Sequence, residues 1–113
     1  MKAELRDFAV REIGCIPCRI AGYEGVPCEK HHLLTTGRHG NGKRRGEQAT
    51  IGCCPYHHRG SAAVGTITAR MMRADYGPSY ADEPEAFRAT FGTDDALLTL
   101  QDALIDAWMG ATV

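Results

Sequence analysis

With 113 residues, 43% of them hydrophobic and 24% charged, the chain has the composition of a soluble globular protein rather than a fibrous or disordered one. No apolar run approaches the ~20 residues that span a bilayer, and the N-terminus lacks the apolar core of a signal peptide. We therefore expect one cytoplasmic domain without membrane contact. The net charge of −1 conceals ten Lys/Arg against six Asp/Glu in residues 1–60, and three against eight in residues 61–113. A polyanion such as a nucleic acid could dock on the first part.

Apolar residues at helical spacing predict a helix over residues 3–13, and Gly14 is expected to end it. The side chains expected on its inner face are Leu5, Phe8, Ala9 and Ile13. Arg6 is expected to face solvent, together with the other charged residues of this segment.

Two motifs place metal-ligating side chains three residues apart, Cys-x-x-Cys at residues 15–18 and Cys-x-x-His at residues 54–57. Five cysteines in a reducing compartment favour metal binding over disulfides, and a structural zinc takes four such ligands as two close pairs. The spacing favours one set of four ligands: Cys15, Cys18, Cys54 and His57. A rival set replaces the second pair with Cys28 and His31, which are also three residues apart, and Cys53 is expected to pack inward. A redox role for the first pair is disfavoured because no βαβ pattern surrounds it.

Two short strands are predicted over residues 28–34 and 49–53, antiparallel to each other. Between them, residues 35–48 contain four glycines and four Lys/Arg, which is typical of a mobile basic loop. Such a loop would grip phosphates without reading sequence. The side chains expected to contact nucleic acid here are Arg38, Lys43, Arg44 and Arg45.

The remainder of the chain is predicted to be helical. One helix is expected over residues 62–75 and a second over residues 82–91, with Pro84 in its first turn and Gly92 at its end. Thr93 is then expected to cap a last helix. The inner face of that helix is expected to carry Leu97, Leu100, Leu104, Ile105 and Trp108.

Four of the five histidines stand in two adjacent pairs, His31-His32 and His57-His58. If His57 binds zinc, the other three can serve a hydrolytic site, which needs a cation with open positions and a base. Imidazole suits the base because its pKa lies near neutral pH. Adjacent strand residues point to opposite faces, so His31 and His32 could share a site only from an irregular or strand-end position.

The His-His-Leu motif on a first strand, followed by a second strand that ends in Cys-x-x-His-His at a helix start, resembles the HNH nucleases of the ββα-metal fold. The longer stretches at residues 30–38, 50–60 and 77–98 resemble the phage recombination-enhancement (Ref) nucleases, from about residue 15 to the C-terminus. The founding member of that family cuts DNA held by RecA filaments. The resemblance implies an α+β fold, with a zinc-stapled ββα-metal core over residues 15–75, an N-terminal helix, and a C-terminal helical part over residues 76–113.

The resemblance also implies a role for each histidine. His31 and His58 would bind a catalytic Mg²⁺ or Mn²⁺, and His32 would be the general base. The predicted Cys₃His set would hold a structural Zn²⁺, and Arg38 and Arg59 would hold phosphate oxygens. The implied function is a metal-dependent DNA endonuclease in the cytoplasm of a bacterial or phage-infected cell, with DNA as substrate and the RecA filament as a partner.

Two features depart from the family pattern. The position before the second strand, usually Asn or His, reads Glu47-Gln48-Ala49, and the founding member carries a long basic N-terminal extension that precedes the part resembling this chain. RecA dependence is therefore left open at this point. The alternative function is a zinc-containing nucleic-acid-binding or protein adaptor that no longer cleaves.

Overall fold

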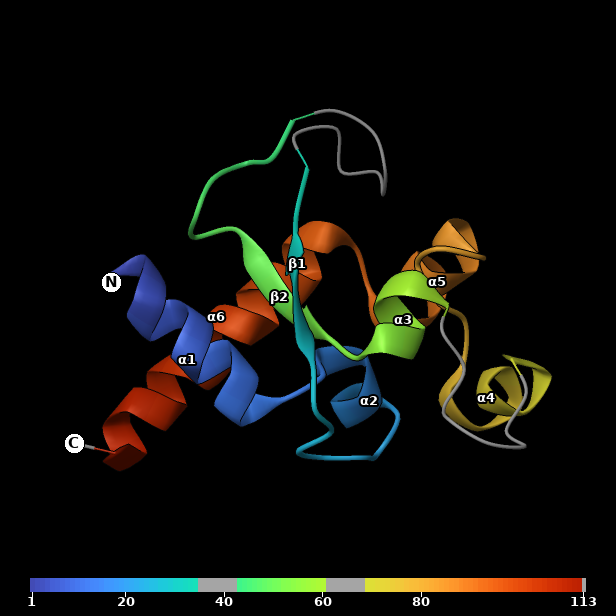
Figure 1. Cartoon of the computed structure of the whole chain (residues 1–113), viewed down its shortest axis with the longest axis horizontal. Helices are drawn as coiled ribbons and strands as arrows, with labels where there is room; N and C mark the ends of the chain where they lie inside the picture. Colours follow the sequence, from blue (N-terminus) through green and yellow to red (C-terminus); the bar gives the residue numbers. More distant parts are fainter. Residues whose placement is uncertain (35–42, 61–68, 113) are drawn as a thin grey trace.

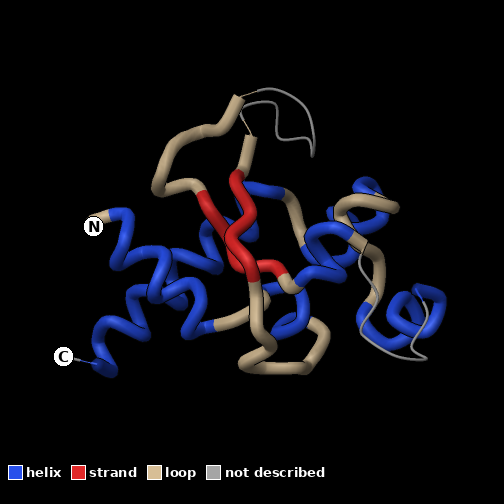
Figure 2. Tube along the Cα trace, in the orientation of Figure 1, coloured by secondary structure: helices blue, strands red, loops and turns tan. Residues whose placement is uncertain are grey.

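The structure, a computed structural model, describes residues 1–34, 43–60 and 69–112, in which helices surround a two-stranded antiparallel sheet (Figure 1, Figure 2). The elements follow in the order α1 (Ala3–Ile13), α2 (Ile16–Ile20), β1 (Glu29–His32), β2 (Thr50–Cys53), α3 (Pro55–Arg59), α4 (Ala69–Tyr76), α5 (Pro84–Phe91) and α6 (Asp94–Thr112). The α+β class is as predicted. Most of the basic loop and the expected start of a helix at residue 62 lie outside the described residues. None of the helices in the described part has the length and apolar character needed to cross a membrane.

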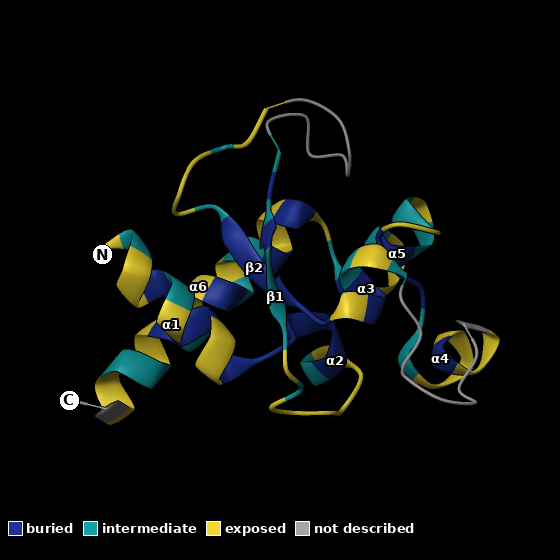
Figure 3. Ribbon diagram, viewed as in Figure 1, coloured by how far each residue is buried: buried dark blue, intermediate teal, exposed yellow. Residues whose placement is uncertain are grey.

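The hairpin lies at the centre of the molecule, between α1 and α6 on one side and α3 to α5 on the other (Figure 1). Its register pairs Glu29 with Cys53 and His32 with Thr50, so the predicted antiparallel pairing is confirmed with slightly shorter strands. Every residue of β2 is buried (Figure 3). A Cβ on Gly52 would lie 2.8 Å from the Cys28 sulfur, so this strand position requires glycine to let its neighbours approach.

The ends of the helices follow the predicted signals. Gly14 ends α1 with a φ of 91°, and a Cβ there would lie only 2.7 Å from the carbonyl oxygen of Val26. Gly92 follows the last residue of α5. The Oγ1 of Thr93 accepts a hydrogen bond from the backbone N–H of Ala96 at 3.1 Å, which satisfies one of the unpaired donors in the first turn of α6.

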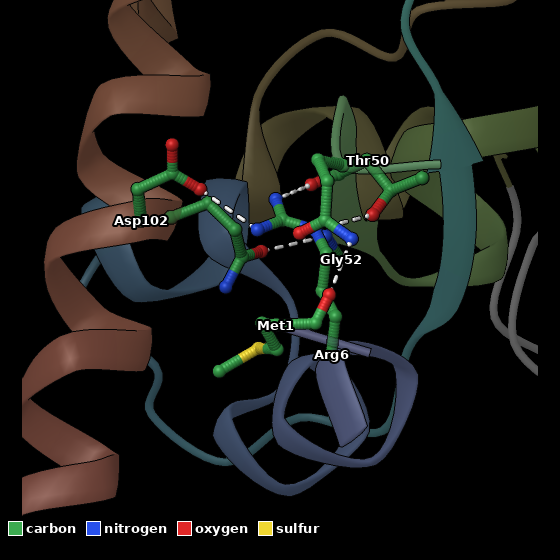
Figure 4. A network of polar contacts seen from close by, with 7 residues as sticks. Met1, Arg6, Thr50, Gly52 and Asp102 are labelled. Atoms are coloured by element: carbon green, nitrogen blue, oxygen red, sulfur yellow. Dashed lines mark hydrogen bonds and ion pairs between the residues drawn. The ribbon is translucent and has the colours of Figure 1, made fainter. Parts of the chain in front are cut away.

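The predicted inner face of α1 is partly wrong. Leu5 and Phe8 are 39% and 55% exposed, whereas Arg6 is only 4% exposed. The Arg6 guanidinium donates to Thr50 through Nε to Oγ1 (3.0 Å) and Nη2 to the carbonyl oxygen (2.7 Å), and through Nη1 to Asp102 (2.8 Å) (Figure 4). A buried cation with this many partners is stable where a lone one would not be. The helix is therefore rotated to direct an arginine, rather than two apolar residues, at β2.

Most of the predicted inner face of α6 is confirmed. Leu97 and Ile105 are buried, and the partly buried residues packed against the same core include Leu100, Leu104 and Trp108. Gln101, which the apolar pattern did not indicate, is fully buried in the middle of this face. Its Oε1 accepts a hydrogen bond from the backbone N–H of Gly52 at 2.9 Å, so α6 is attached to β2 by a polar contact as well as by packing.

Candidate metal centre and active site

The two Cys-x-x-Cys/His motifs have the same local geometry. Each first cysteine is the N-cap of a five-residue helix, Cys15 for α2 and Cys54 for α3. The Sγ atom of Cys15 accepts a hydrogen bond from the backbone N–H of Cys18, and that of Cys54 accepts one from His57, both at 3.4 Å. When an N-cap side chain accepts a hydrogen bond from the backbone N–H three residues later, the side chains at both positions lie on the same side of the turn.

Folding then brings the two turns together. The Nδ1 atom of His57 lies 3.6, 3.4 and 3.2 Å from the sulfurs of Cys15, Cys18 and Cys54, and the last two sulfurs are 3.7 Å apart. Tetrahedral zinc with ordinary bond lengths requires about 3.6 Å between a sulfur and a nitrogen and about 3.8 Å between two sulfurs. All four side chains are buried and their ligand atoms lie within 4.8 Å of one another. The cluster fits a structural zinc.

The surroundings of His57 also suit a metal ligand. Its second ring nitrogen, Nε2, lies 2.8 Å from the carbonyl oxygen of Tyr76, and this contact holds the proton on Nε2 and the lone pair on Nδ1. Hydrogen bonding to Cys18 and Cys54, together with burial, raises the pKa of the Cys15 thiol. The neighbouring sulfurs therefore oppose ionisation of all three thiols at once. A divalent cation at their centre would stabilise the three thiolates.

The rival ligand set is not assembled. The sulfur of Cys28 lies 3.5 Å from the carbonyl oxygen of Val10, and the cluster found within the described ranges contains neither Cys28 nor His31. Cys53 is fully buried in β2, where it packs in the apolar core as expected. Burial is the main reason that the pKa of its thiol is raised well above the ordinary value.

A second group of residues meets directly beside the Cys₃His cluster, where β1 passes α3. The rings of His31 and His58 pack edge to face with centroids 4.9 Å apart. His31 is 5% exposed, and the ring of buried Tyr80 packs against it at 4.7 Å. Because His57 and His58 are consecutive in α3, the helix carries one histidine for each group. The structure thus brings together the two histidines expected to bind a catalytic cation.

Glu29 joins this second group and was not singled out from the sequence. Its Oε1 lies 2.8 Å from Nδ1 of His58 and 2.7 Å from Nε of Arg59. Burial opposes ionisation of Glu29, but the hydrogen bonds from Arg59 and His58 outweigh it and lower the carboxyl pKa. The sequence did hold a signal: Glu29 and His31 are two residues apart in a strand, so they share a face.

His32 is the last residue of β1, which is the strand-end position that a shared site with His31 requires. Strand alternation directs its side chain toward the face opposite His31. Burial, and then the positive charges of Arg44 and Lys30, lower the pKa of His32. A lowered pKa keeps this imidazole neutral near pH 7, which is the form that accepts a proton.

The basic residues predicted to contact nucleic acid have different surroundings. Lys43, Arg44 and Arg59 are exposed, whereas Arg45 donates to the carbonyl oxygen of Leu34 at 2.8 Å and pairs with a carboxylate of α6, that of Asp95, at 2.5 Å. Arg45 is therefore engaged in holding the loop to α6. Arg38 lies outside the residues that the structure describes.

Comparison with known proteins gives a single assignment. No curated protein and no solved structure gave a significant match to the chain. A family profile described as "recombination enhancement, RecA-dependent nuclease" matches residues 2–106, nearly the whole chain. The match includes the Cys₃His cluster, the His31–His58 pair and His32. The chain belongs to the recombination-enhancement, RecA-dependent nuclease family.

Proposed function

We propose that this protein is a metal-dependent DNA endonuclease of the HNH type, built on a ββα-metal core formed by β1, β2 and α3. The observation that carries the proposal is the meeting of His31 and His58, one from the hairpin and one from the helix that follows it. Zinc in the Cys₃His cluster would fix α2 and α3 to each other, and so fix the position of His58. Family membership supports a nuclease acting on DNA.

His31 and His58 would hold a divalent cation, Mg²⁺ or Mn²⁺. Two protein ligands suffice because Mg²⁺ commonly keeps several of its waters. When bound, the cation supplies a Lewis acid that polarises the phosphate and stabilises the leaving oxygen. His32 would reach around the end of β1 to take the proton from the attacking water, and Arg59 would hold a phosphate oxygen.

DNA affinity would come mainly from phosphate contacts by the exposed cations Lys43 and Arg44, together with Arg38. Such contacts release counterions, so binding should weaken as salt rises. The family description supports the RecA filament as the partner that presents the DNA.

The test is plasmid nicking with Mg²⁺ or Mn²⁺, with and without RecA filaments. The His32→Ala variant should lose about 10²–10⁴ in rate, which is the usual contribution of a general base. Arg11→Ala, which removes an exposed side chain from the outer face of α1, is the control and should nick like the wild type. Equal cleavage by wild type and His32→Ala would refute the assignment of the base.

A second candidate, an adaptor that binds nucleic acid without cutting it, is favoured by one observation. Where HNH enzymes have Asn or His, this chain has exposed Glu47, and the amide of neighbouring Gln48 donates to the carbonyl oxygen of Met1 at 3.0 Å. Glu47 acts on His32 through its charge, which opposes the lowering of the His32 pKa, and it lacks the amide that the HNH pattern has at this position. Salt-dependent DNA binding with no nicking under any condition would favour the adaptor.

A further inference from the structure

Glu29 occupies an unusual position for a partly exposed acid. A single carboxylate oxygen, Oε1, contacts both Nδ1 of His58 (2.8 Å) and Nε of Arg59 (2.7 Å). The side chains of Glu29 and His58 are 34% and 23% exposed, so water only partly screens this contact. The carboxylate also projects from the same face of β1 as His31, whose ring packs on His58.

The contact with His58 determines which ring nitrogen can bind a cation. A neutral imidazole that donates through Nδ1 to a carboxylate carries its lone pair on Nε2. Histidine ligands commonly have such an outer partner, which fixes both the tautomer and the ring orientation. Removing the carboxylate removes the acceptor that holds the proton on Nδ1 of His58.

The contact with Arg59 extends this control to the neighbouring cation. Arg59 is 58% exposed, and an exposed ion pair by itself contributes little stability. Its Nε is nevertheless fixed by the oxygen that fixes His58, while a guanidinium has further donors on its two terminal nitrogens. One acid thus sets the relative position of two consecutive side chains of α3.

We propose that Glu29 is a positioning residue of the hydrolytic site, which selects Nε2 of His58 as the cation ligand and aligns Arg59 with the bound phosphate. The proposal rests on the proposed function, because it assigns His58 to the cation and Arg59 to the phosphate. In this proposal Glu29 acts through His58 and Arg59 rather than by contacting the cation or the reacting atoms itself.

The test compares Glu29→Ala and Glu29→Gln with the wild type, using the full zinc-loaded chain. The control is Glu24→Gln, which makes the same change at an exposed acid that is paired with Arg19 at 3.4 Å. Long-range ¹H–¹⁵N NMR reports the tautomer of His58 without added metal, and calorimetry reports Mn²⁺ affinity. Zinc content and thermal melting show whether each variant is folded.

In the wild type and Glu24→Gln, His58 should carry its proton on Nδ1. Glu29→Ala should lose that preference and bind Mn²⁺ about 10- to 100-fold more weakly, as expected for loss of an outer-shell partner. Glu29→Gln, whose amide oxygen can still accept from Nδ1, should lose less and retain the tautomer. If Glu29 formed only a structural ion pair, the tautomer of His58 would be the same in all variants. Mn²⁺ affinity would then not fall in the order wild type, Glu29→Gln, Glu29→Ala.

Two results would overturn the proposal, and they differ in what else they affect. A folded Glu29→Ala protein with wild-type tautomer and wild-type Mn²⁺ affinity refutes the role of Glu29 while leaving the proposed nuclease intact. A wild-type chain that takes up zinc but binds neither Mn²⁺ nor Mg²⁺ refutes the proposed function, and the role of Glu29 with it.

Discussion

The hydrogen bonds of buried Arg6 should contribute unequally to stability. We expect removal of Arg6 to cost much more than removal of its exposed partner Asp102. In Arg6→Met, the methionine keeps much of the apolar stem but leaves Oγ1 and the carbonyl oxygen of Thr50 without their donors. Buried hydrogen bonds to a charged group contribute about 1.5–3 kcal/mol each. The contact with Asp102 adds less than about 1 kcal/mol, because that side chain is 52% exposed. Since the lost contacts share one residue and are not additive, we expect Arg6→Met to cost about 3–4 kcal/mol.

Urea unfolding of the zinc-loaded protein measures this difference. Asp102→Ala is the matched variant, because it removes only the exposed end of the network, and it should cost less than about 1 kcal/mol and lose less still at high salt. Chains of this size have total stabilities of about 5–15 kcal/mol, so Arg6→Met should still fold at low temperature. An Arg6→Met cost under about 1 kcal/mol, or one equal to that of Asp102→Ala, would refute the reasoning.

Three further substitutions test individual contacts of the structure. Cys15→Ser should release zinc and unfold the protein, because metal-binding energy is folding energy in such sites; a folded, zinc-loaded variant, seen by metal analysis and circular dichroism, would exclude Cys15 as a ligand. Gly52→Ala should lower the free energy of unfolding by about 1–3 kcal/mol, because its Cβ would lie 2.8 Å from the Cys28 sulfur; an unchanged free energy of unfolding in urea would show that the strand moves freely. Tyr80→Phe should cost about 1–2 kcal/mol in thermal or urea unfolding, because the buried Tyr80 hydroxyl donates to Asp94 at 3.0 Å; a more stable variant would contradict this.

Local sequence signals predicted the parts of the molecule that depend on short-range geometry. The Cys₃His cluster could be predicted from spacing, because a cysteine N-cap brings its own side chain together with that of the residue three positions later. The ends of α1 and α5 could be predicted from Gly14 and Gly92, because a glycine C-cap also acts locally. These features are decided within a few residues of the chain.

The parts that were missed depend on partners far away in the chain. Arg6 was expected to face solvent because charged residues usually do. Its buried position depends on its partners Thr50 and Asp102, which lie 44 and 96 residues away in the sequence. Gln101 likewise interrupts an apolar face to reach the backbone of β2. Glu29 could have been found by applying strand alternation to His31, but its contact with His58 required knowing how α3 packs on β1.

Helix α3 has a consequence for the order in which the protein assembles. Five residues are too few to form a stable helix in isolation, so α3 depends on the Cys54 and His57 contacts that close the zinc cluster. His58 is next in the same helix, so we expect it to meet His31 only after that closure. For the nuclease proposed above, we therefore expect a newly synthesised chain to remain inactive toward DNA until zinc is delivered, so that metal supply rather than translation would set the moment at which cutting begins.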